Sequence, residues 1–552
     1  MKETEKYELW LARVTDAEVR AQLESMRGDE NAIVNAFYKD LEFGTGGLRG
    51  ELGAGTNCLN VYTIRKVTQG IADCMKRYGF RTAAISRDSR IGSDRFAAAA
   101  AEVFAANGIT AYVTHELMPT PFLSYMTRET KSDIGVMITA SHNPSKYNGY
   151  KVYGADGCQL TDARAAEMTG YIEAVDPFAV PVKPFEEGLK DGSIRYIDDG
   201  LIDRYIAAVR EQSLGSAAGV RVVYSALNGT GYKLVPRILR EVGATDVTEV
   251  SEQCRPDGRF PTCPYPNPEK PEALRLGLEL TEKTGADILI ATDPDADRIG
   301  VAVRTADGCR LLSGNETGVL LTDYIFARRK ERGTLPDRPV LVKTIVTTEL
   351  GFKVAEKYRP ETYDVLTGFK YIGDVIGKLE KKGEESRFVF GFEESYGCLA
   401  GTYVRDKDAV VAAMLVAEMA AYYKNRGLTL VDRIEEIYAE FGTYQHKLVS
   451  KEFPGAEGHA RMQTLLENLR RHLPETLAGA KVTEVIDYLV QEEFDLPKSN
   501  VLSLKTDTGT RLVIRPSGTE PLIKFYITAS RTPAENEKTV AAVLGWLDET
   551  FV

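Results

Sequence analysis

The sequence predicts an α/β protein with three related α/β domains followed by a C-terminal α+β domain. Two observations carry this prediction. The chain has 552 residues, which is enough for about three to five domains of roughly 100–200 residues each. Apolar runs of strand length also alternate with helical patterns three times between residues 80 and 390, and such alternation is typical of crossover α/β units.

Each of the three units has a strand, a helix and a second strand. The expected elements are 82–85, a helix around Phe96 and Phe104, and 109–113 in the first unit; 220–224, 234–242 and 288–291 in the second; and 340–346, 349–357 and 388–390 in the third. This order indicates a crossover connection in each unit.

The last hundred or so residues follow a different order. A helical pattern over 460–471 is followed by three short strands and a helix, at 501–504, 511–514, 523–527 and 536–549. Helices and strands that do not alternate predict a separate α+β domain. We therefore expect four domains, with bounds 1–210, 211–320, 321–440 and 441–552.

The composition excludes several classes of function. The 69 Lys and Arg against 80 Asp and Glu leave a net charge of −11. No long cationic run is present, so neither nucleic acid nor an anionic membrane surface is an expected partner. Seven scattered cysteines without a C-x-x-C pair favour a reducing cytoplasm and argue against a structural zinc site.

Two segments bear on whether the protein enters a membrane or is exported. The start, Met1-Lys-Glu-Thr-Glu-Lys6, lacks the apolar stretch of a secretory signal. The apolar run 409–417 is about half as long as the roughly 20 residues that a membrane span needs, so it predicts a buried helix. We expect a cytoplasmic protein.

The first loop with chemical character is Thr139-Ala-Ser141-His142-Asn143-Pro144, after the apolar strand 134–138. A serine on a tight loop bounded by proline suits a nucleophile that is activated or carries a phosphate. A turn in which these residues only serve backbone geometry is the alternative. The loop is not the G-x-S-x-G elbow, and the adjacency of His142 does not by itself make a catalytic pair.

The second loop places Asp293, Asp295 and Asp297 between two apolar strands, followed by Arg298. Three carboxylates at alternate positions repel one another unless a cation holds them, so the pattern indicates a divalent metal with oxygen ligands. A solvated acidic turn is the alternative. An EF-hand is excluded because Arg298 stands where that loop requires glycine.

The third loop, Arg515-Pro-Ser517-Gly518-Thr519, has Lys524 beyond it. A guanidinium, hydroxyls and glycine-adjacent N–H groups can cradle a phosphate, and a plain turn is the alternative. The fourth loop, Gly44-Thr45-Gly-Gly-Leu-Arg49-Gly50, is rich in glycine and ends in a cation. It has neither the Walker ending nor the dinucleotide spacing.

The fifth loop, Gly391-Phe-Glu393-Glu394-Ser395-Tyr396-Gly397, follows the apolar strand 388–390. Carboxylate and hydroxyl groups at alternate positions can bind the vicinal hydroxyls of a sugar. A capped helix start or an acidic turn would explain the same residues equally well.

Together, and in this order, the five loops resemble those of the α-D-phosphohexomutase superfamily, the phosphoglucomutases and phosphomannomutases. The resemblance extends over nearly the whole chain, and the Thr-Ala-Ser-His-Asn-Pro and Asp-Pro-Asp-Ala-Asp-Arg loops are highly specific when found together. The length and the Gly-Thr-Gly-Gly-Leu-Arg and Gly-Phe-Glu-Glu-Ser-Tyr-Gly motifs look most like the longer phosphoglucomutase branch. The resemblance implies mixed sheets in the three α/β domains and a central cleft shared by four domains.

The resemblance implies a phosphoserine enzyme that interconverts glucose 1-phosphate and glucose 6-phosphate. It implies Mg²⁺ as the metal and glucose 1,6-bisphosphate as intermediate and activator. Ser141, Lys151 and Arg298 match catalytic residues, and Ser141, Asp293, Asp295 and Asp297 match metal ligands. The positions that match substrate contacts are Thr45, Arg49, His142, Lys370, Glu393, Ser395, Arg515, Ser517, Gly518, Thr519 and Lys524.

The sequence leaves several alternative functions open. Within the family they are a phosphomannomutase or a phosphopentomutase, although Tyr396 follows Ser395 where some relatives have a histidine. A metal-dependent sugar phosphatase with Asp293 as nucleophile is a different enzyme class, and a binding protein without turnover is a third class. The expected partners are small sugar phosphates, and the expected assembly is a monomer or weak homodimer. Since a dianion is repelled by a net charge of −11, the cations must line a local pocket.

Overall fold

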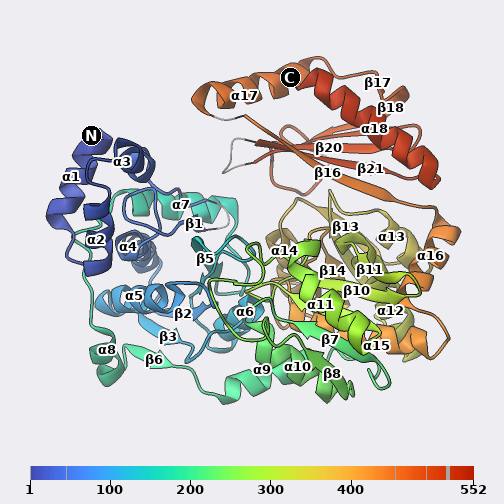
Figure 1. Cartoon of the computed structure of the whole chain (residues 1–552), viewed down its shortest axis with the longest axis horizontal. Helices are drawn as coiled ribbons and strands as arrows, with labels where there is room; N and C mark the ends of the chain where they lie inside the picture. The colour runs from blue at the N-terminus through green and yellow to red at the C-terminus, as the bar shows by residue number, and fades with distance from the viewer. Residues whose placement is uncertain (1, 45–46, 454, 493, 518–521, 552) are drawn as a thin grey trace.

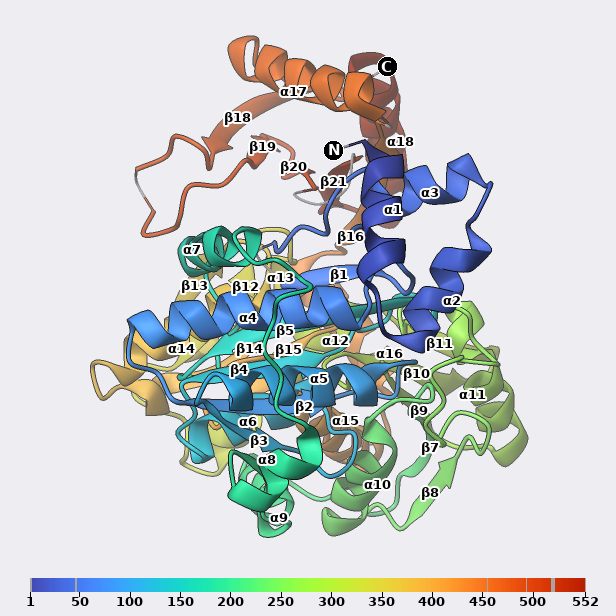
Figure 2. The same cartoon turned by 90° about the vertical axis from the view of Figure 1, so that its left-hand side faces the viewer.

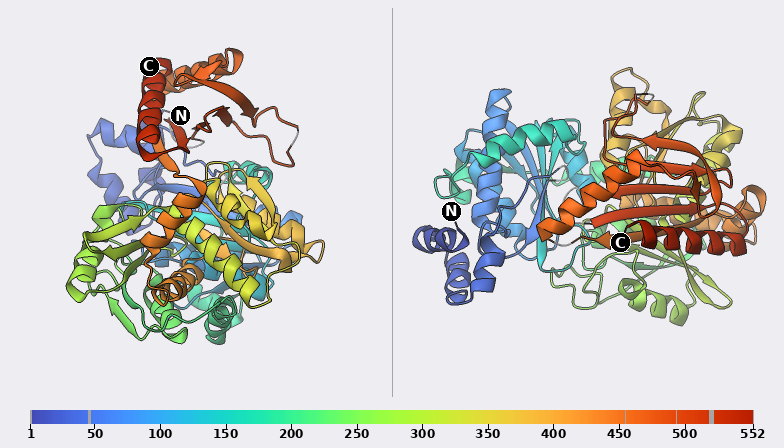
Figure 3. Two further views of the ribbon diagram at one scale, coloured as in Figure 1. Left: turned by 90° about the vertical axis from the view of Figure 1, so that its right-hand side faces the viewer. Right: turned by 90° about the horizontal axis from the view of Figure 1, so that it is seen from above.

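The computed structural model describes residues 2–44, 47–453, 455–492, 494–517 and 522–551. Four sheets with their helices form the four domains that the sequence predicts (Figure 1). Three α/β domains lie together, and the fourth domain lies over them, as the further views also show (Figures 2 and 3). Three helices that the sequence pattern did not predict precede the first sheet: α1 (Glu3–Arg13), α2 (Ala17–Ser25) and α3 (Glu30–Phe37).

The first domain has a mixed sheet, as expected. Its elements are β1 (Leu48–Glu51), α4 (Val61–Arg77), β2 (Thr82–Arg87), α5 (Ser93–Ala106), β3 (Thr110–Val113), α6 (Thr120–Glu129), β4 (Ile134–Ile138), β5 (Tyr147–Gly154), α7 (Asp162–Glu173), α8 (Phe185–Asp191) and β6 (Ile194–Tyr196). The strand order is β1-β5-β4-β2-β3-β6. β2 is parallel to β3 and β4, whereas β5 is antiparallel to β4 and β1.

The side chains of β2 explain why this sheet has helices on both faces. Ala83 and Ile85 belong to the apolar core that includes Phe104 of α5. Ala84, between them, belongs to a second core that includes Phe122 of α6. Because successive side chains of a strand point to opposite faces, an apolar run without alternation predicts a strand buried on both sides.

The second and third domains repeat this plan. The second contains α9 (Gly200–Arg210), β7 (Arg221–Ser225), α10 (Gly231–Glu241), β8 (Asp246–Glu249), α11 (Pro271–Thr284), β9 (Ile288–Thr292), β10 (Ile299–Thr305) and β11 (Gly308–Leu312). The third contains α12 (Gly314–Glu331), β12 (Val340–Thr344), α13 (Leu350–Ala355), η1 (Glu356–Tyr358), β13 (Glu361–Val365), α14 (Phe369–Glu380), η2 (Glu385–Arg387), β14 (Phe388–Phe392), β15 (Cys398–Ala400), α15 (Ala409–Lys424) and α16 (Leu430–Phe441).

The sheets of these two domains are also mixed. Their strand orders are β11-β10-β9-β7-β8 and β13-β12-β14-β15. In each, a parallel set carries antiparallel strands at one edge. β12 ends two residues before the predicted end at residue 346, because a turn begins there: the Thr347 N–H donates to the Thr344 carbonyl at 2.9 Å.

The fourth domain is the predicted α+β domain. It contains β16 (Gln445–Glu452), α17 (Gly455–Arg471), β17 (Thr476–Leu477), β18 (Ala480–Asp487), β19 (Leu502–Thr506), β20 (Arg511–Pro516), β21 (Leu522–Ala529) and α18 (Pro533–Thr550). The strands pair antiparallel in the order β16-β21-β20-β19-β18-β17. Both helices lie on the face of this sheet that points away from the other domains (Figure 1).

One apolar core joins the first three domains. It includes Phe122 of the first domain, Ile290 of the second and Phe390 of the third. The predicted buried helix over 409–417 is part of α15, which is buried along most of its length. In the part of the chain that the structure describes, no helix is both long and apolar enough to cross a membrane.

The fourth domain packs on the third through an apolar patch and a group of charges. Val346 and Leu366 of the third domain contact a cluster with Val513 and Tyr526 of the fourth. Beside this cluster the buried Lys343 pairs with Glu349 at 3.1 Å and with Asp364 at 2.9 Å, and Arg511 of β20 pairs with Glu349 at 3.0 Å.

The polar loops come together because of the way the strands end. The serine loop follows β4, the aspartate loop follows β9 and the Glu393 loop follows β14, each a strand that is parallel to a neighbour. Ligand sites of α/β sheets lie at these carboxyl ends. Backbone hydrogen bonds then join the aspartate loop to its neighbours: the Thr120 N–H donates to the Asp295 carbonyl at 2.9 Å and the Ile299 N–H to the Tyr396 carbonyl at 3.0 Å.

A glycine contact makes the packing of the aspartate loop testable. A Cβ atom at Gly229 would lie 2.3 Å from the Pro294 Cα and 2.5 Å from its carbonyl oxygen. We expect Gly229→Ala to destabilise the protein by about 1–3 kcal/mol, as overpacking does, and to lower Tm. Gly377→Ala in α14 is the matched control: a Cβ there meets nothing within 4 Å, so replacing a helix glycine should raise stability by up to about 1 kcal/mol. Equal Tm values for the two variants would contradict the prediction.

Candidate active site

Ser141 lies at the start of the turn after β4, with its hydroxyl directed at the aspartate loop. Its backbone has a φ of 52°, and holding a residue with a Cβ in this region costs on the order of 1–2 kcal/mol. The Ser141 N–H donates to the Thr139 Oγ1 at 2.8 Å, and the Ser141 Oγ donates to the Asp293 Oδ2 at 2.8 Å. The residue is 4% exposed. The strained turn thus fixes a buried hydroxyl against a carboxylate of another domain.

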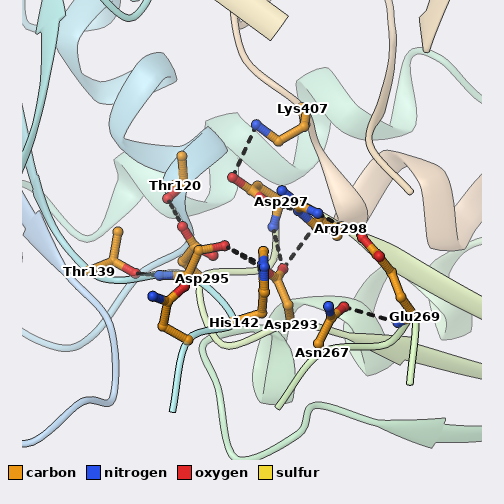
Figure 4. Close-up of polar contacts among 12 residues, drawn as sticks. Thr120, Thr139, His142, Asn267, Glu269, Asp293, Asp295, Asp297, Arg298 and Lys407 are labelled. Carbon is orange, nitrogen blue, oxygen red and sulfur yellow. Dashed lines mark hydrogen bonds and ion pairs between the residues drawn. The ribbon is translucent and has the colours of Figure 1, made fainter. Parts of the chain in front are cut away.

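Three carboxylates, Asp293, Asp295 and Asp297, converge beside this serine. Ligand oxygens from all three lie within 4.8 Å of one another, and Figure 4 shows them grouped at the centre of the site. The Oδ1 atoms of Asp295 and Asp297 are buried and have no hydrogen-bond partner. Such oxygens suit the ligand set of a hard divalent cation. The residues present therefore fit a metal ion, with the Ser141 oxygen next to it.

Cations and N–H groups occupy the remaining oxygens of the cluster. The Lys151 Nζ lies 2.8 Å from the Asp295 Oδ2 and 3.4 Å from the Asp297 Oδ2. The Lys407 Nζ lies 3.2 Å from the same Asp297 oxygen. The backbone N–H groups of Asp297 and Arg298 both donate to the Asp293 Oδ1. These contacts leave the Oδ1 atoms of Asp295 and Asp297 without a hydrogen-bond partner.

Burial and like charges affect the three carboxyls unequally. Burial raises the pKa of Asp293 well above its ordinary value, and the neighbouring Asp295 and Asp297 raise it further. Burial acts in the same direction on Asp295, but the Lys151 ammonium and the hydrogen bonds with Asp293 and Thr120 together outweigh it and lower that pKa. Asp293 is therefore the carboxyl whose charge most needs a bound cation.

Arg298 and His142 complete the surroundings of the serine. The Arg298 guanidinium donates to the Glu269 Oε1 at 2.8 Å and lies 3.8 Å from the Asp297 Oδ1. The His142 Nδ1 lies 3.3 Å from the Ser141 Oγ. Burial, with Arg298 and Arg49 nearby, lowers the pKa of His142 well below its ordinary value. The imidazole is therefore neutral at pH 7.

The loop after β14 separates its two glutamates. Glu394 accepts from the Thr347 hydroxyl at 2.9 Å and so anchors the loop. Glu393 accepts from the Gly368 N–H at 3.1 Å. Burial raises the pKa of Glu393 to about 7, even though Lys407 opposes the shift. Ser395 lies on the same loop and is half-buried. The Glu393 carboxyl therefore changes its charge near neutral pH.

Arg49 contacts the serine loop and lines a cleft beside it. The Arg49 guanidinium donates to the Asn143 Oδ1 at 3.1 Å. A cleft of about 1280 Å³ is lined by residues that include Arg49, His142, Lys151 and Lys270. The structure thus places two of the predicted cations, Arg49 and Lys151, in one pocket wall. Thr45 lies outside the described residues.

The other expected substrate contacts come from the third and fourth domains. Lys370, at the start of α14, pairs with Asp162 of α7 and lies 5.1 Å from the Tyr371 ring centroid, so its ammonium links the third domain to the first. Arg515 of β20 faces Lys524 of β21 in the strand register. The Ser517 N–H donates to the Leu522 carbonyl at 2.8 Å. Gly518 and Thr519 lie outside the described residues.

The structure adds residues that the sequence patterns did not single out. Lys407 belongs to the charged run Arg405-Asp406-Lys407-Asp408 just before the buried helix α15. Four charges next to an apolar helix are a pattern from which this residue could have been predicted. Thr120 donates to the Asp295 Oδ2 at 2.7 Å. Arg90 is buried behind the serine loop and contacts its backbone. Single residues such as Thr120 and Arg90 carry no pattern that marks them.

The comparisons with known proteins agree with this geometry. Four family models match in chain order: the phosphoglucomutase/phosphomannomutase α/β/α domains I, II and III at residues 40–177, 203–308 and 313–441, and the C-terminal domain at 466–545. A phosphoglucomutase of Staphylococcus aureus is 36% identical over 544 residues, with 94% of this chain and 95% of that protein covered.

Two solved structures show the same fold. A putative phosphomannomutase from Thermus thermophilus superposes with a TM-score of 0.70 at 21% identity, covering 92% of this chain and 99% of that one. An Aspergillus fumigatus N-acetylphosphoglucosamine mutase, in complex with GlcNAc-6P and magnesium, superposes with a TM-score of 0.51 at 15% identity, covering 97% and 99%.

The carboxylate cluster predicts a stabilising effect of divalent cations. A cation that binds the folded state raises stability by about 2.7 kcal/mol at 100 times its Kd, so we expect Mg²⁺ or Mn²⁺ to raise Tm. Asp297→Asn should remove most of this rise, because it replaces a carboxylate whose Oδ1 has no hydrogen-bond partner. The control is Asp307→Asn, an exposed aspartate of the same domain, which should keep the full rise. An unchanged rise in Asp297→Asn would contradict a metal site at this cluster.

Proposed function

The chain belongs to the phosphoglucomutase/phosphomannomutase family, and from this premise we propose that it is a phosphoglucomutase that interconverts glucose 1-phosphate and glucose 6-phosphate. The observation that supports the proposal most is the 2.8 Å contact between the Ser141 hydroxyl and Asp293 within the carboxylate cluster. It unites a nucleophile and a metal site from two domains. The Staphylococcus aureus relative is named a phosphoglucomutase, and the similarity covers 95% of its length. This relative supports glucose as the sugar.

We propose that the metal is Mg²⁺, held by Asp293, Asp295, Asp297 and an oxygen on Ser141. All of these donors are hard oxygens, which Mg²⁺ prefers. The Aspergillus mutase that shares the fold was solved with magnesium and a sugar phosphate. When bound, the metal supplies Lewis-acid stabilisation of the phosphoryl oxygens. We propose glucose 1,6-bisphosphate as the intermediate and activator.

In the proposed reaction Ser141 carries the phosphoryl group. The bond from the Ser141 oxygen to phosphorus breaks while a bond from the free hydroxyl oxygen of the sugar monophosphate to phosphorus forms. In net, the hydroxyl proton passes to the serine oxygen, which becomes a free hydroxyl. The bisphosphate then turns over and returns its other phosphate to Ser141. Lys151 and Arg298 stabilise the charge on the transferring group, and Lys151 is the residue that we assign to proton transfer. Catalysis of this kind depends on positioning and on cations placed near the phosphoryl oxygens.

The remaining predicted residues have binding roles in this proposal. Glu393 and Ser395 bind sugar hydroxyls, and Lys370 helps to seat the sugar. Neutral His142 lies close enough to the serine to contact the phosphoryl group. We propose that the fourth domain binds the phosphate that does not react, through Arg515, Ser517, Gly518, Thr519 and Lys524. Thr45 and Arg49 of the first domain would form the wall of the cleft.

The geometry favours Ser141 over Asp293 as the nucleophile. Both oxygens of Asp293 already accept hydrogen bonds, from the Ser141 hydroxyl on one side and from two backbone N–H groups on the other. A phosphatase that loads Asp293 would have to break these contacts. A mannose phosphate remains an alternative substrate, since the family models carry the names of both phosphoglucomutase and phosphomannomutase. A pentose phosphate remains the other alternative that the sequence left open.

Replacing the serine tests the proposal directly. We expect Ser141→Ala to abolish the conversion of glucose 1-phosphate to glucose 6-phosphate in the presence of Mg²⁺ and a trace of glucose 1,6-bisphosphate. Intact-mass measurement should show one added phosphate on the wild type and none on the variant. Ser145→Ala, on the same loop, is the matched control and should keep its activity.

Three results would count against the proposal. They are full activity in Ser141→Ala, a higher kcat/KM for mannose 1-phosphate or ribose 1-phosphate than for glucose 1-phosphate, and release of free phosphate that Asp293→Asn abolishes but Ser141→Ala does not.

The raised pKa of Glu393 predicts opposite effects on stability and activity. Its pKa of about 7 lies above the ordinary value of 4.5. The stability linked to the protonated carboxyl is therefore present below about pH 4.5 and is lost as the pH rises through 7. We expect Glu393→Gln to be more stable than the wild type at pH 8, by on the order of 2 kcal/mol, with a smaller gain at pH 5.5.

The same variant should lose activity. Hydrogen bonds to a charged group contribute about 1.5–3 kcal/mol, so kcat/KM should fall by about 10- to 100-fold. Thermal unfolding and steady-state kinetics at the two pH values measure both effects. Glu356→Gln, an exposed residue of the same domain, is the control. A stability difference that does not change with pH would contradict the assignment of the titration to Glu393.

A further inference from the structure

The loop that carries Ser141 is held from behind by a buried ion pair that the proposed chemistry does not use. Arg90 and Asp88 follow β2, and both side chains are fully buried. The Arg90 Nε lies 3.3 Å from the Asp88 Oδ2. A buried ion pair is weak support for stability by itself, because desolvation offsets the attraction. The role of the Arg90–Asp88 pair therefore has to be inferred from the groups that it contacts.

The guanidinium of Arg90 binds the backbone of the serine loop at four points. Nη1 donates to the carbonyls of Pro144 and Tyr147, each at 2.9 Å, and Nη2 donates to the carbonyls of Ser141 and Asn143. Four carbonyls between Ser141 and the first residue of β5 thus point at a single cation. A planar guanidinium offers several donors in a fixed geometry, which an ammonium group does not.

The carboxylate of Asp88 holds the opposite side of the nucleophile. The Thr139 Oγ1 donates to the Asp88 Oδ2 at 2.6 Å and accepts from the Ser141 N–H at 2.8 Å. The N–H of Ser141 is therefore tied to Asp88 through one hydroxyl, and its carbonyl is tied directly to Arg90. These two tethers fix both peptide groups of a residue whose φ is 52°.

The second domain contacts the same pair. Gly258 forms a β-bridge with Arg90, and a Cβ at Gly258 would lie 2.5 Å from the Ile91 nitrogen and 2.6 Å from the Ser89 carbonyl oxygen. The Phe260 ring centroid lies 5.0 Å from the Arg90 Cζ. The second domain also carries the three aspartates. The Arg90 segment therefore lies between the serine loop and the domain that holds the carboxylate cluster.

We propose that Arg90, with Asp88 and Thr139, is a positioning group that sets the orientation of the Ser141 oxygen toward Asp293 and the reacting phosphate. Arg90 touches no reacting atom in this proposal and acts through the backbone of the serine loop. The proposal rests on the proposed mutase function for its kinetic test. It predicts that a change at Arg90 or Thr139 affects phosphoryl transfer while sugar binding, which other loops perform, remains.

The experiment compares two pairs of variants. Arg90→Lys keeps a charge but loses the fixed fork of donors. Because a misplacement of about 1 Å can lower a rate by about 100-fold, we expect kcat to fall by about 100-fold and KM for glucose 1-phosphate to stay within about threefold. Arg433→Lys is the matched control, since Arg433 is largely buried and pairs with Asp323 at 2.8 Å in the third domain. It should keep its kcat.

The second pair tests the tether on the other side and does not depend on the folding of Arg90→Lys. Thr139→Val keeps the shape but removes the hydroxyl between Asp88 and the Ser141 N–H, so kcat should fall by at least about tenfold. Thr139→Ser keeps the hydroxyl and should stay within about threefold of the wild type. Kinetic rescue by the conservative variant is a result that a role in packing alone would not give.

A measurement without substrate separates this inference from the proposed function. Amide hydrogen exchange over residues 139–147 should become at least about tenfold faster in Arg90→Lys than in Arg433→Lys, with the rest of the first domain unchanged. If the wild type turned over no sugar phosphate, the proposed function would fail and the exchange result would still decide the role of Arg90. Unchanged exchange, or kcat values of Arg90→Lys and Thr139→Val within threefold of the wild type, would overturn the inference.

Discussion

The structure depends on the burial of three like charges where three domains meet. Asp293, Asp295 and Asp297 are each at most 2% exposed, and buried carboxylates at this separation repel one another unless cations accompany them. Lys151 comes from the first domain and Lys407 from the third. The cluster therefore requires the domains to keep their relative positions, and the apolar core shared by all three provides that rigidity.

The same constraint explains why the loops of the site are held through their backbone groups. The aspartate loop is bonded through its backbone to α6 of the first domain and to the Glu393 loop of the third. The serine loop is bonded through its backbone to Arg90. Phosphoryl transfer depends on the positions of few atoms. A site built in this way can combine a strained serine with a cluster of mutually repelling carboxylates.

Much of the fold and of the site could be predicted from sequence because the relevant signals are local. The alternation of strands and helices gave the α/β units, and the mixed sheets and four-domain arrangement implied by the resemblance are confirmed. The missed elements include the three N-terminal helices and the strands β16, β17 and β18 of the fourth domain. β16 has no fully buried side chain, so it lacks the apolar pattern on which the prediction relied.

The sequence by itself determined the chemistry: a serine on a tight turn, three alternating carboxylates and a chain long enough for the domains that carry them. The tertiary structure decided which groups surround them. Lys407 reaches Asp297 across 110 residues of sequence, and Arg90 reaches the carbonyl of Ser141 across 51. No local pattern shows which residues form such pairs, because the two partners lie on elements that are far apart in the chain. Their positions follow from how the sheets pack, and packing is a property of the whole chain.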